Sequence, residues 1–210
     1  MVLLRTIKKY DVHLKSTHKI TLRIILFLTV HVALTYNECS DQKQCFGHPP
    51  GCVNKTSCDF VTSLKFSERH LDIELVKNKI EQASYIAIAF SDDQKMGNDL
   101  VFACSPSWES KTAIKLFWNQ RDYYSEILYG QQDLIQNPST TWEGSLFTCK
   151  LSLDKVVLAK GKRFEFECGY YILLAAGPVN GAMIDQHADI TSRSASTSRF
   201  KTSKLKIGFL

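Results

Sequence analysis

Apolar and polar residues alternate with a period of two in several stretches of this chain, and this pattern most narrows what it can fold into. The alternation runs through residues 71–75, 147–153 and 164–168, and no long segment repeats with the period of a helix. Further short β-rich runs cover residues 85–90, 112–118, 170–174 and 205–209. About seven or eight short strands separated by polar turns predict an all-β domain, an antiparallel β-sandwich or barrel.

The first 36 residues have the layout of a targeting segment. A basic stretch is followed by the mostly apolar residues 24–36, which is typical of a signal peptide with its exit near Thr35. The alternative is an uncleaved membrane anchor, but a span needs about 20 apolar residues, and Arg23, Thr29 and His31 interrupt this stretch. We therefore expect a secreted chain that begins near Asn37.

Charge is distributed unevenly along the chain. The overall formal charge is +5, but residues 1–36 and 190–210 are each basic, which leaves 15 basic and 20 acidic residues in 37–189. A mildly acidic body between basic ends is not the pattern of a nucleic-acid-binding domain. Residues 191–210 are basic and rich in Ser and Thr, which is typical of a solvated tail, with a candidate last strand at 205–209.

The chain holds seven cysteines, all after the apolar leader. Cys39, Cys45, Cys52 and Cys58 fall in one short segment with Gly and Pro, which in a secreted chain predicts a disulfide-stapled segment over 37–60. Zinc is the alternative, but zinc ligands are usually paired two to four residues apart. Asn54 begins a glycosylation sequon within this segment, which fits the secretory route.

The remaining cysteines include two that the alternation places on apolar strand faces. Cys149 and Cys168 lie on such faces of neighbouring strands, so a bridge between them is geometrically allowed. Two buried free thiols are the alternative, because free cysteines are common in protein cores. The total is odd, so one thiol is free or pairs outside the chain.

Two segments carry more information than a generic strand. The predicted strand 85–90 is followed directly by Ser-Asp-Asp-Gln-Lys-Met96-Gly97, a polar loop with a methionine. The run Tyr-Tyr-Ile-Leu-Leu-Ala-Ala-Gly177-Pro178 is expected to end a buried strand, and His187 follows. Over residues 39–190 these motifs, with the preceding Cys-Phe-Gly-His-Pro-Pro-Gly-Cys segment, resemble the DOMON family, in particular the extracellular domain of ferric-chelate-reductase-like proteins.

The resemblance implies an immunoglobulin-like β-sandwich over residues 61–190 and a cofactor. Family members bind haem b or, in some branches, sugars, and the cytochrome members hold haem between a methionine and a histidine. Met96 and His187 match these positions and are the candidate axial ligands. With both axial positions filled, such an iron passes electrons and does not activate oxygen. If both ligands reach one haem from a single rim, meaning the same end of the sandwich, the two strands that precede them must run in the same direction.

The resemblance also implies partners. In ferric-chelate-reductase-like proteins the domain precedes a multi-helix membrane cytochrome, whereas no apolar stretch of spanning length follows residue 177 here. We therefore expect a free secreted domain, a subunit of a redox system with a membrane cytochrome or another redox protein, or an incomplete gene product, and no enzyme activity of the chain alone.

A haem-free module that binds carbohydrate or a protein is the competing interpretation. Trp108, Trp118 and Trp142 are aromatic candidates for stacking on sugar rings. Asp92, Asp93 and Asp99 do not match a calcium loop and are expected to be solvated turn acids.

Overall fold

The computed structural model describes Cys39 and residues 43–49, 51–55, 57–93, 95–109, 113–121 and 124–185. The chain divides into two compact units, Met1–Cys39 and Ser40–Leu210, and every described strand belongs to the second. The candidate signal segment, His187 and the candidate strand 205–209 lie outside the described residues. Among the described residues, no helix is long and apolar enough to cross a bilayer.

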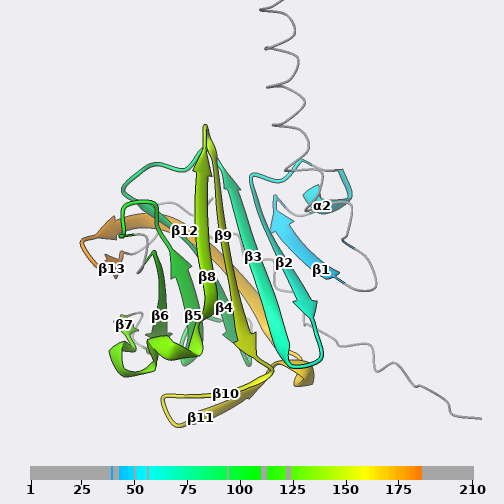
Figure 1. The fold of residues 1–210 in the computed structure, drawn as a ribbon, viewed down its shortest axis with the longest axis vertical. Helices are drawn as coiled ribbons and strands as arrows, with labels where there is room; N and C mark the ends of the chain where they lie inside the picture. The colour runs from blue at the N-terminus through cyan, green and yellow to red at the C-terminus, as the bar shows by residue number, and fades with distance from the viewer. Residues whose placement is uncertain are drawn as a thin grey trace, which may run out of the picture. The chain divides into compact units, whose positions relative to one another are not determined.

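Antiparallel strands make up nearly all of the second unit, in a sandwich-like arrangement of two sheets and one hairpin (Figure 1). The first sheet has the order β1-β2-β3-β9-β8, with bounds Lys43–His48, Phe60–Phe66, His70–Asn78, Leu146–Asp154 and Gln136–Glu143. The second has the order β13-β12-β4-β5-β6-β7, with bounds Met183–Ile184, Tyr171–Asn180, Ser84–Ser91, Asp99–Cys104, Ile114–Asn119 and Ser125–Ile127. Strands β10 (Val156–Ala159) and β11 (Lys162–Glu165) form the separate hairpin. The predicted β-sandwich is confirmed.

Three short helices complete the described elements. They are α2 (Cys52–Lys55), η2 (Tyr129–Leu134) and η3 (Phe166–Cys168). Helix α2 carries Asn54, whose side chain is not among the described ones.

Alternating side chains of the two sheets form the core between them. Phe147, Cys149, Leu151 and Leu153 of β9 are all buried, as their period-two spacing predicts. On the facing sheet, Phe90 packs its ring against Phe102, Phe166 and Tyr170, and the hairpin β10–β11 contributes Val157 and Phe164 to the same cluster.

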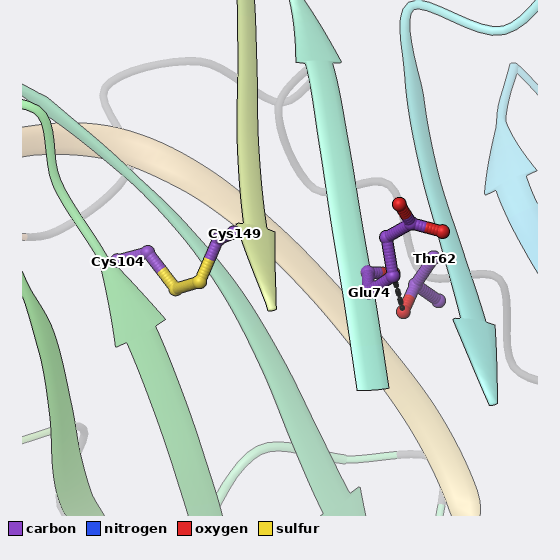
Figure 2. The surroundings of a disulfide bond; sticks show 4 residues. All are labelled: Thr62, Glu74, Cys104 and Cys149. Atoms are coloured by element: carbon purple, nitrogen blue, oxygen red, sulfur yellow. Dashed lines mark hydrogen bonds between the residues drawn. A yellow bond between two sulfur atoms is a disulfide. The ribbon is translucent and has the colours of Figure 1, made fainter. Parts of the chain in front are cut away.

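One disulfide joins the two sheets through this core. Cys104 of β5 is bonded to Cys149 of β9, and both residues are fully buried (Figure 2). The expected bridge between Cys149 and Cys168 is wrong, because Cys168 is a free, exposed cysteine. The alternation ends at Glu165: Phe166–Cys168 is the 3₁₀ turn η3, which turns the Cys168 thiol outward toward Glu165.

The cysteine-rich segment is part of the first sheet. Its strand β1 pairs with β2 along its whole length, and Lys43 reaches across to Glu74 of β3 (3.4 Å). Cys52 and Cys58 form a disulfide, and Cys39 and Cys45 are also disulfide-bonded. The prediction of disulfides in this segment is confirmed, and they fit an oxidising compartment.

Strand β12 is longer than the sequence indicated. It continues through Gly177 and Pro178 to Asn180 and pairs with β4 from Tyr171 opposite Ser91 to Pro178 opposite Ser84. A turn then leads back into β13, where Ile184 pairs with Val179. The Gly-Pro pair therefore lies inside the strand and does not end it.

Candidate functional site

The loop between β4 and β5 carries Met96, and its own hydrogen bonds hold it. The Ser91 hydroxyl at the end of β4 donates to the Lys95 carbonyl (3.3 Å) and accepts from the Asp93 N–H (3.3 Å). The Lys95 N–H donates to the Asp93 carboxylate (2.7 Å), which is an Asx turn. The chain on the amino-terminal side of Met96 is therefore fixed against the strand that precedes it.

The other side of the loop requires a glycine next to the methionine. Gly97 has φ +128°, and a Cβ there would lie 3.2 Å from the Cα of Arg121. The Gly97 N–H donates to the Asp99 carboxylate (2.7 Å), and the Asn98 N–H donates to the Asn119 carbonyl (2.7 Å). These bonds tie the loop to the first residue of β5 and to the end of β6.

Met96 itself is only partly covered by the rest of the domain. It is 40% exposed, although it lies in a loop anchored on both sides. Part of this side chain lies in water, and it carries a thioether sulfur. The thioether is therefore available to a ligand, a metal or a partner.

Asp99 is buried, in contrast to the solvated turn acid that the sequence suggested. The prediction was wrong because Asp99 is the first residue of β5, on the outer face of the sheet and beneath the Met96 loop. Burial raises the pKa of Asp99 to about 6, against the opposing effect of the Ser91 hydroxyl and the Gly97 N–H. Asp92 and Asp93 are exposed, and Asp92 pairs with Lys162 of β11 (2.7 Å).

The outer face of the six-stranded sheet is apolar and rich in small side chains. Its side chains form a second buried cluster on the side away from the sandwich core: Tyr85, Ala87, Ala89, Val101, Ala103, Trp108, Phe117, Ile127 and Leu173. The short β-rich run 85–90 predicted a strand here, but a face that looks away from the sandwich core is usually polar in an antiparallel sheet. This face therefore forms a second apolar cluster, beside the loop that carries Met96.

The turn between β12 and β13 is anchored at one end of this outer face. The Trp108 indole N–H donates to the Gly181 carbonyl (2.9 Å), and Lys115 Nζ lies 4.1 Å from the Trp108 ring centre and donates to Ala182 (3.2 Å). The Tyr85 hydroxyl donates to the Asp185 carbonyl (3.3 Å). These contacts fix the chain as far as Asp185, two residues before His187.

Trp108→Phe is expected to loosen this turn. The ring contact with Phe117 stays, but the Gly181 carbonyl loses its donor, so the free energy of unfolding falls by about 1 kcal/mol. Amide hydrogen exchange of residues 181–184 is expected to become faster than in the parent protein. Trp142→Phe is the matched control, because Trp142 is 43% exposed, and equal effects of the two substitutions would contradict the anchoring role.

Met96 and the segment that leads to His187 lie toward opposite ends of β4. Strands β4 and β12 are antiparallel neighbours, so the requirement that they run in the same sense is not met. Tyr85, which holds Asp185, is about 20 Å along the strand from Ser91, which holds the Met96 loop. Two further residues reach at most about 7 Å beyond Asp185.

The described strands do not bring the two candidate ligand segments to one end of the sandwich, so they form no clasp of one iron from a single rim. Axial ligands bind opposite faces of a haem iron, so approach from opposite directions is itself no conflict. Met96 is among the described residues, whereas His187 lies outside them. No group of three or more His, Cys, Asp or Glu side chains that could hold a metal ion occurs in the described part of the chain.

Comparison with known proteins gives relatives that include ferric-chelate reductases and DOMON domain-containing proteins. A putative ferric-chelate reductase 1 homolog of Drosophila melanogaster is 30% identical over 68% of this chain and 22% of its own length. The human DOMON domain-containing protein FRRS1L is 29% identical over 76% of this chain and 52% of its own length. A putative ferric-chelate reductase 1 of Danio rerio is 26% identical over 72% of this chain and 26% of its own length.

The chain thus spans about half or less of the length of these relatives, and no protein-family model matches it. The named relatives confirm the resemblance that the Met96 loop and the strand before His187 indicated. Over about 70% of its length the chain is homologous to DOMON domain-containing and ferric-chelate-reductase-like proteins, a redox-related group.

Proposed function

We propose that this chain is an extracellular redox domain that holds haem b, with Met96 as one axial ligand and His187 as the other. The observation that carries the proposal is the exposed thioether of Met96 on a loop anchored on both sides. A ligand loop must keep its donor atom near a fixed place before the cofactor arrives, and the hydrogen bonds on both sides of Met96 support this role.

The residues around Met96 have distinct roles in this proposal. Ser91 and Asp99 orient the loop, and the apolar outer face, with its small Ala87, Ala89 and Ala103, excludes water from the neighbourhood. A bound haem supplies one-electron transfer, and a thioether ligand favours its ferrous state and raises its potential. The turn before Asp185 is anchored to Tyr85 and Trp108, which limits how far His187 can lie from these residues.

The visible spectrum of the protein, produced in a eukaryotic secretory host supplied with haem, tests the proposal. We expect a Soret band that shifts on reduction. His187→Ala should abolish or greatly weaken haem retention, whereas Met96→Leu should keep haem, lower its potential and open a coordination position to carbon monoxide.

Met183 provides the matched control, because it is 37% exposed and Met96 is 40% exposed. Met183→Leu should leave the spectrum and the potential unchanged. If Met183→Leu and not Met96→Leu opens the iron to carbon monoxide, the ligand assignment is wrong. A parent protein that is colourless after haem reconstitution would rule out the redox domain as proposed.

A haem-free binding module is the second candidate, and the exposure of Trp142 favours it. Trp142 on the edge strand β8 is 43% exposed, while Trp108 and Trp118 are buried and so unavailable to stack on a sugar ring. Binding of oligosaccharides by a colourless protein, lost in Trp142→Ala, would support this function instead.

Location and partners follow from the same proposal. Three disulfides and the basic-then-apolar residues 1–36 support secretion with cleavage near Asn37 and modification of Asn54. We propose a membrane cytochrome or another redox protein as the electron partner. N-terminal sequencing of secreted material decides between cleavage and an anchor that retains Met1.

A further inference from the structure

A buried carboxylate beneath an exposed loop needs an explanation. Asp99 is fully buried, and its Oδ1 has no hydrogen-bond partner among the described residues. A buried acid without full pairing costs stability. An apolar residue at the start of β5 would avoid this cost, since Val101 and Ala103 follow it on the same face. The acid therefore has a use other than packing.

Apart from the Ser91 hydroxyl, which lowers the pKa of Asp99, the contacts of this carboxylate are with the loop. Asn119 pairs with Asp99 across the β5–β6 ladder, but its side-chain oxygen accepts from the Ser125 hydroxyl (2.6 Å). The other oxygen of Asp99 accepts the Gly97 N–H at 2.7 Å, a short bond to a carboxylate. Asp99 is thus directed at the peptide group that immediately follows Met96.

The backbone at this point needs such a restraint. Gly97 and Asn98 both have positive φ, +128° and +61°, which most residues avoid. Gly97 also lies against Arg121, so the loop has little freedom to move inward. Without the bond to Asp99, the Met96–Gly97 peptide would lose the contact that holds this conformation.

We propose that Asp99 is a positioning residue that fixes the Met96–Gly97 peptide and thereby the place of the Met96 thioether. The importance of that thioether rests on the proposed function, but the positioning itself does not depend on haem. Asp99 acts on the position of Met96 through the Gly97 N–H.

The test uses the haem-free full-length mature protein with 13C-labelled methionine methyl groups. The chain has three methionines, and Met96→Leu assigns the Met96 signal. In Asp99→Ala we expect the Met96 methyl signal to move to the position of a free methionine, and hydrogen exchange of the Gly97 amide to become about tenfold faster. Asp99→Asn keeps an acceptor oxygen and is expected to restore both readouts.

Two further variants keep the test decisive. Ile73→Val in the opposite sheet removes one buried carbon atom without touching the loop, so it causes a moderate loss of stability and should leave the Met96 signal unchanged. If Asp99→Ala does not fold, Gly97→Ala attacks the same contact from the donor side, because its Cβ would press on Arg121. It should displace the Met96 signal.

The outcomes separate this proposal from the haem proposal. An unmoved Met96 signal in Asp99→Ala, or an Asp99→Asn protein that behaves like Asp99→Ala, overturns the positioning role whether or not haem binds. A displaced signal in a protein that binds no haem supports positioning and rejects only the haem assignment. If haem binds, Asp99→Ala should also alter its potential, while Asp99→Asn should not.

Discussion

Replacing Cys104 and Cys149 together by alanine is expected to lower the free energy of unfolding by about 4 kcal/mol. The bridge closes a loop with a sequence separation of 45, and in the chain-entropy model the loss grows with the logarithm of the loop length. Both cysteines are fully buried between the sheets, so the substitution also removes core contacts. Urea unfolding without reductant measures the change.

The Cys52–Cys58 bridge provides the matched comparison. Its sequence separation is only 6, for which the same model gives about 2 kcal/mol. The double alanine variant at this bridge should therefore lose about half as much stability. Equal losses, or a larger loss at Cys52–Cys58, would show that constraint of the unfolded chain is not the main contribution of the core bridge.

The stability of the parent protein is expected to fall between pH 4 and pH 6 because of Asp99. Burial raises its pKa from 3.8 to about 6, so the folded state binds the proton more tightly than the unfolded state in this range. Stability then decreases as pH rises toward 6, by up to about 3 kcal/mol, and changes no further above that pH. The charges that act on Asp99 are Asp93 in the loop, which raises the pKa, and Lys162 of β11, which lowers it.

Asp99→Asn isolates this contribution from the other carboxyl groups. The variant carries no titrating group at this position, so the stability difference between parent and variant should change by about 2–3 kcal/mol between pH 4 and pH 7. Chemical denaturation at several pH values gives this difference. Parallel pH profiles would mean that Asp99 titrates normally and that its burial carries no such cost.

The sequence by itself determined the fold class and most of the strands that build the core. Period-two alternation located β3 and β9, and a short β-rich run located β4, because one face of each strand is buried and the pattern reports burial directly. Strands β1, β2, β5 and β8 were missed. Strands β2 and β5 are buried on both faces, β8 is an exposed edge strand and β1 lies in the cysteine-rich segment, so none of them alternates cleanly.

The cysteine pairing depended on the tertiary structure. Alternation placed Cys149 on a buried face, which is correct, but it cannot say which strand of the other sheet lies opposite. Cys168 was assigned to a strand that in fact ends at Glu165, so one short turn was enough to expose it. Pairing between distant residues is set by how the two sheets are stacked, which local patterns do not encode.

The site shows the same division. The sequence alone identified the Met96 loop, because an apolar side chain among charged loop residues is visible without any structure. Only the tertiary structure revealed that Asp99 is buried beneath that loop, and that β12 lies antiparallel beside β4 and so directs the segment before His187 to the other end of the strand. Strand sense and the burial of a polar residue both result from long-range pairing of strands, and a pattern of neighbouring residues carries no information about them.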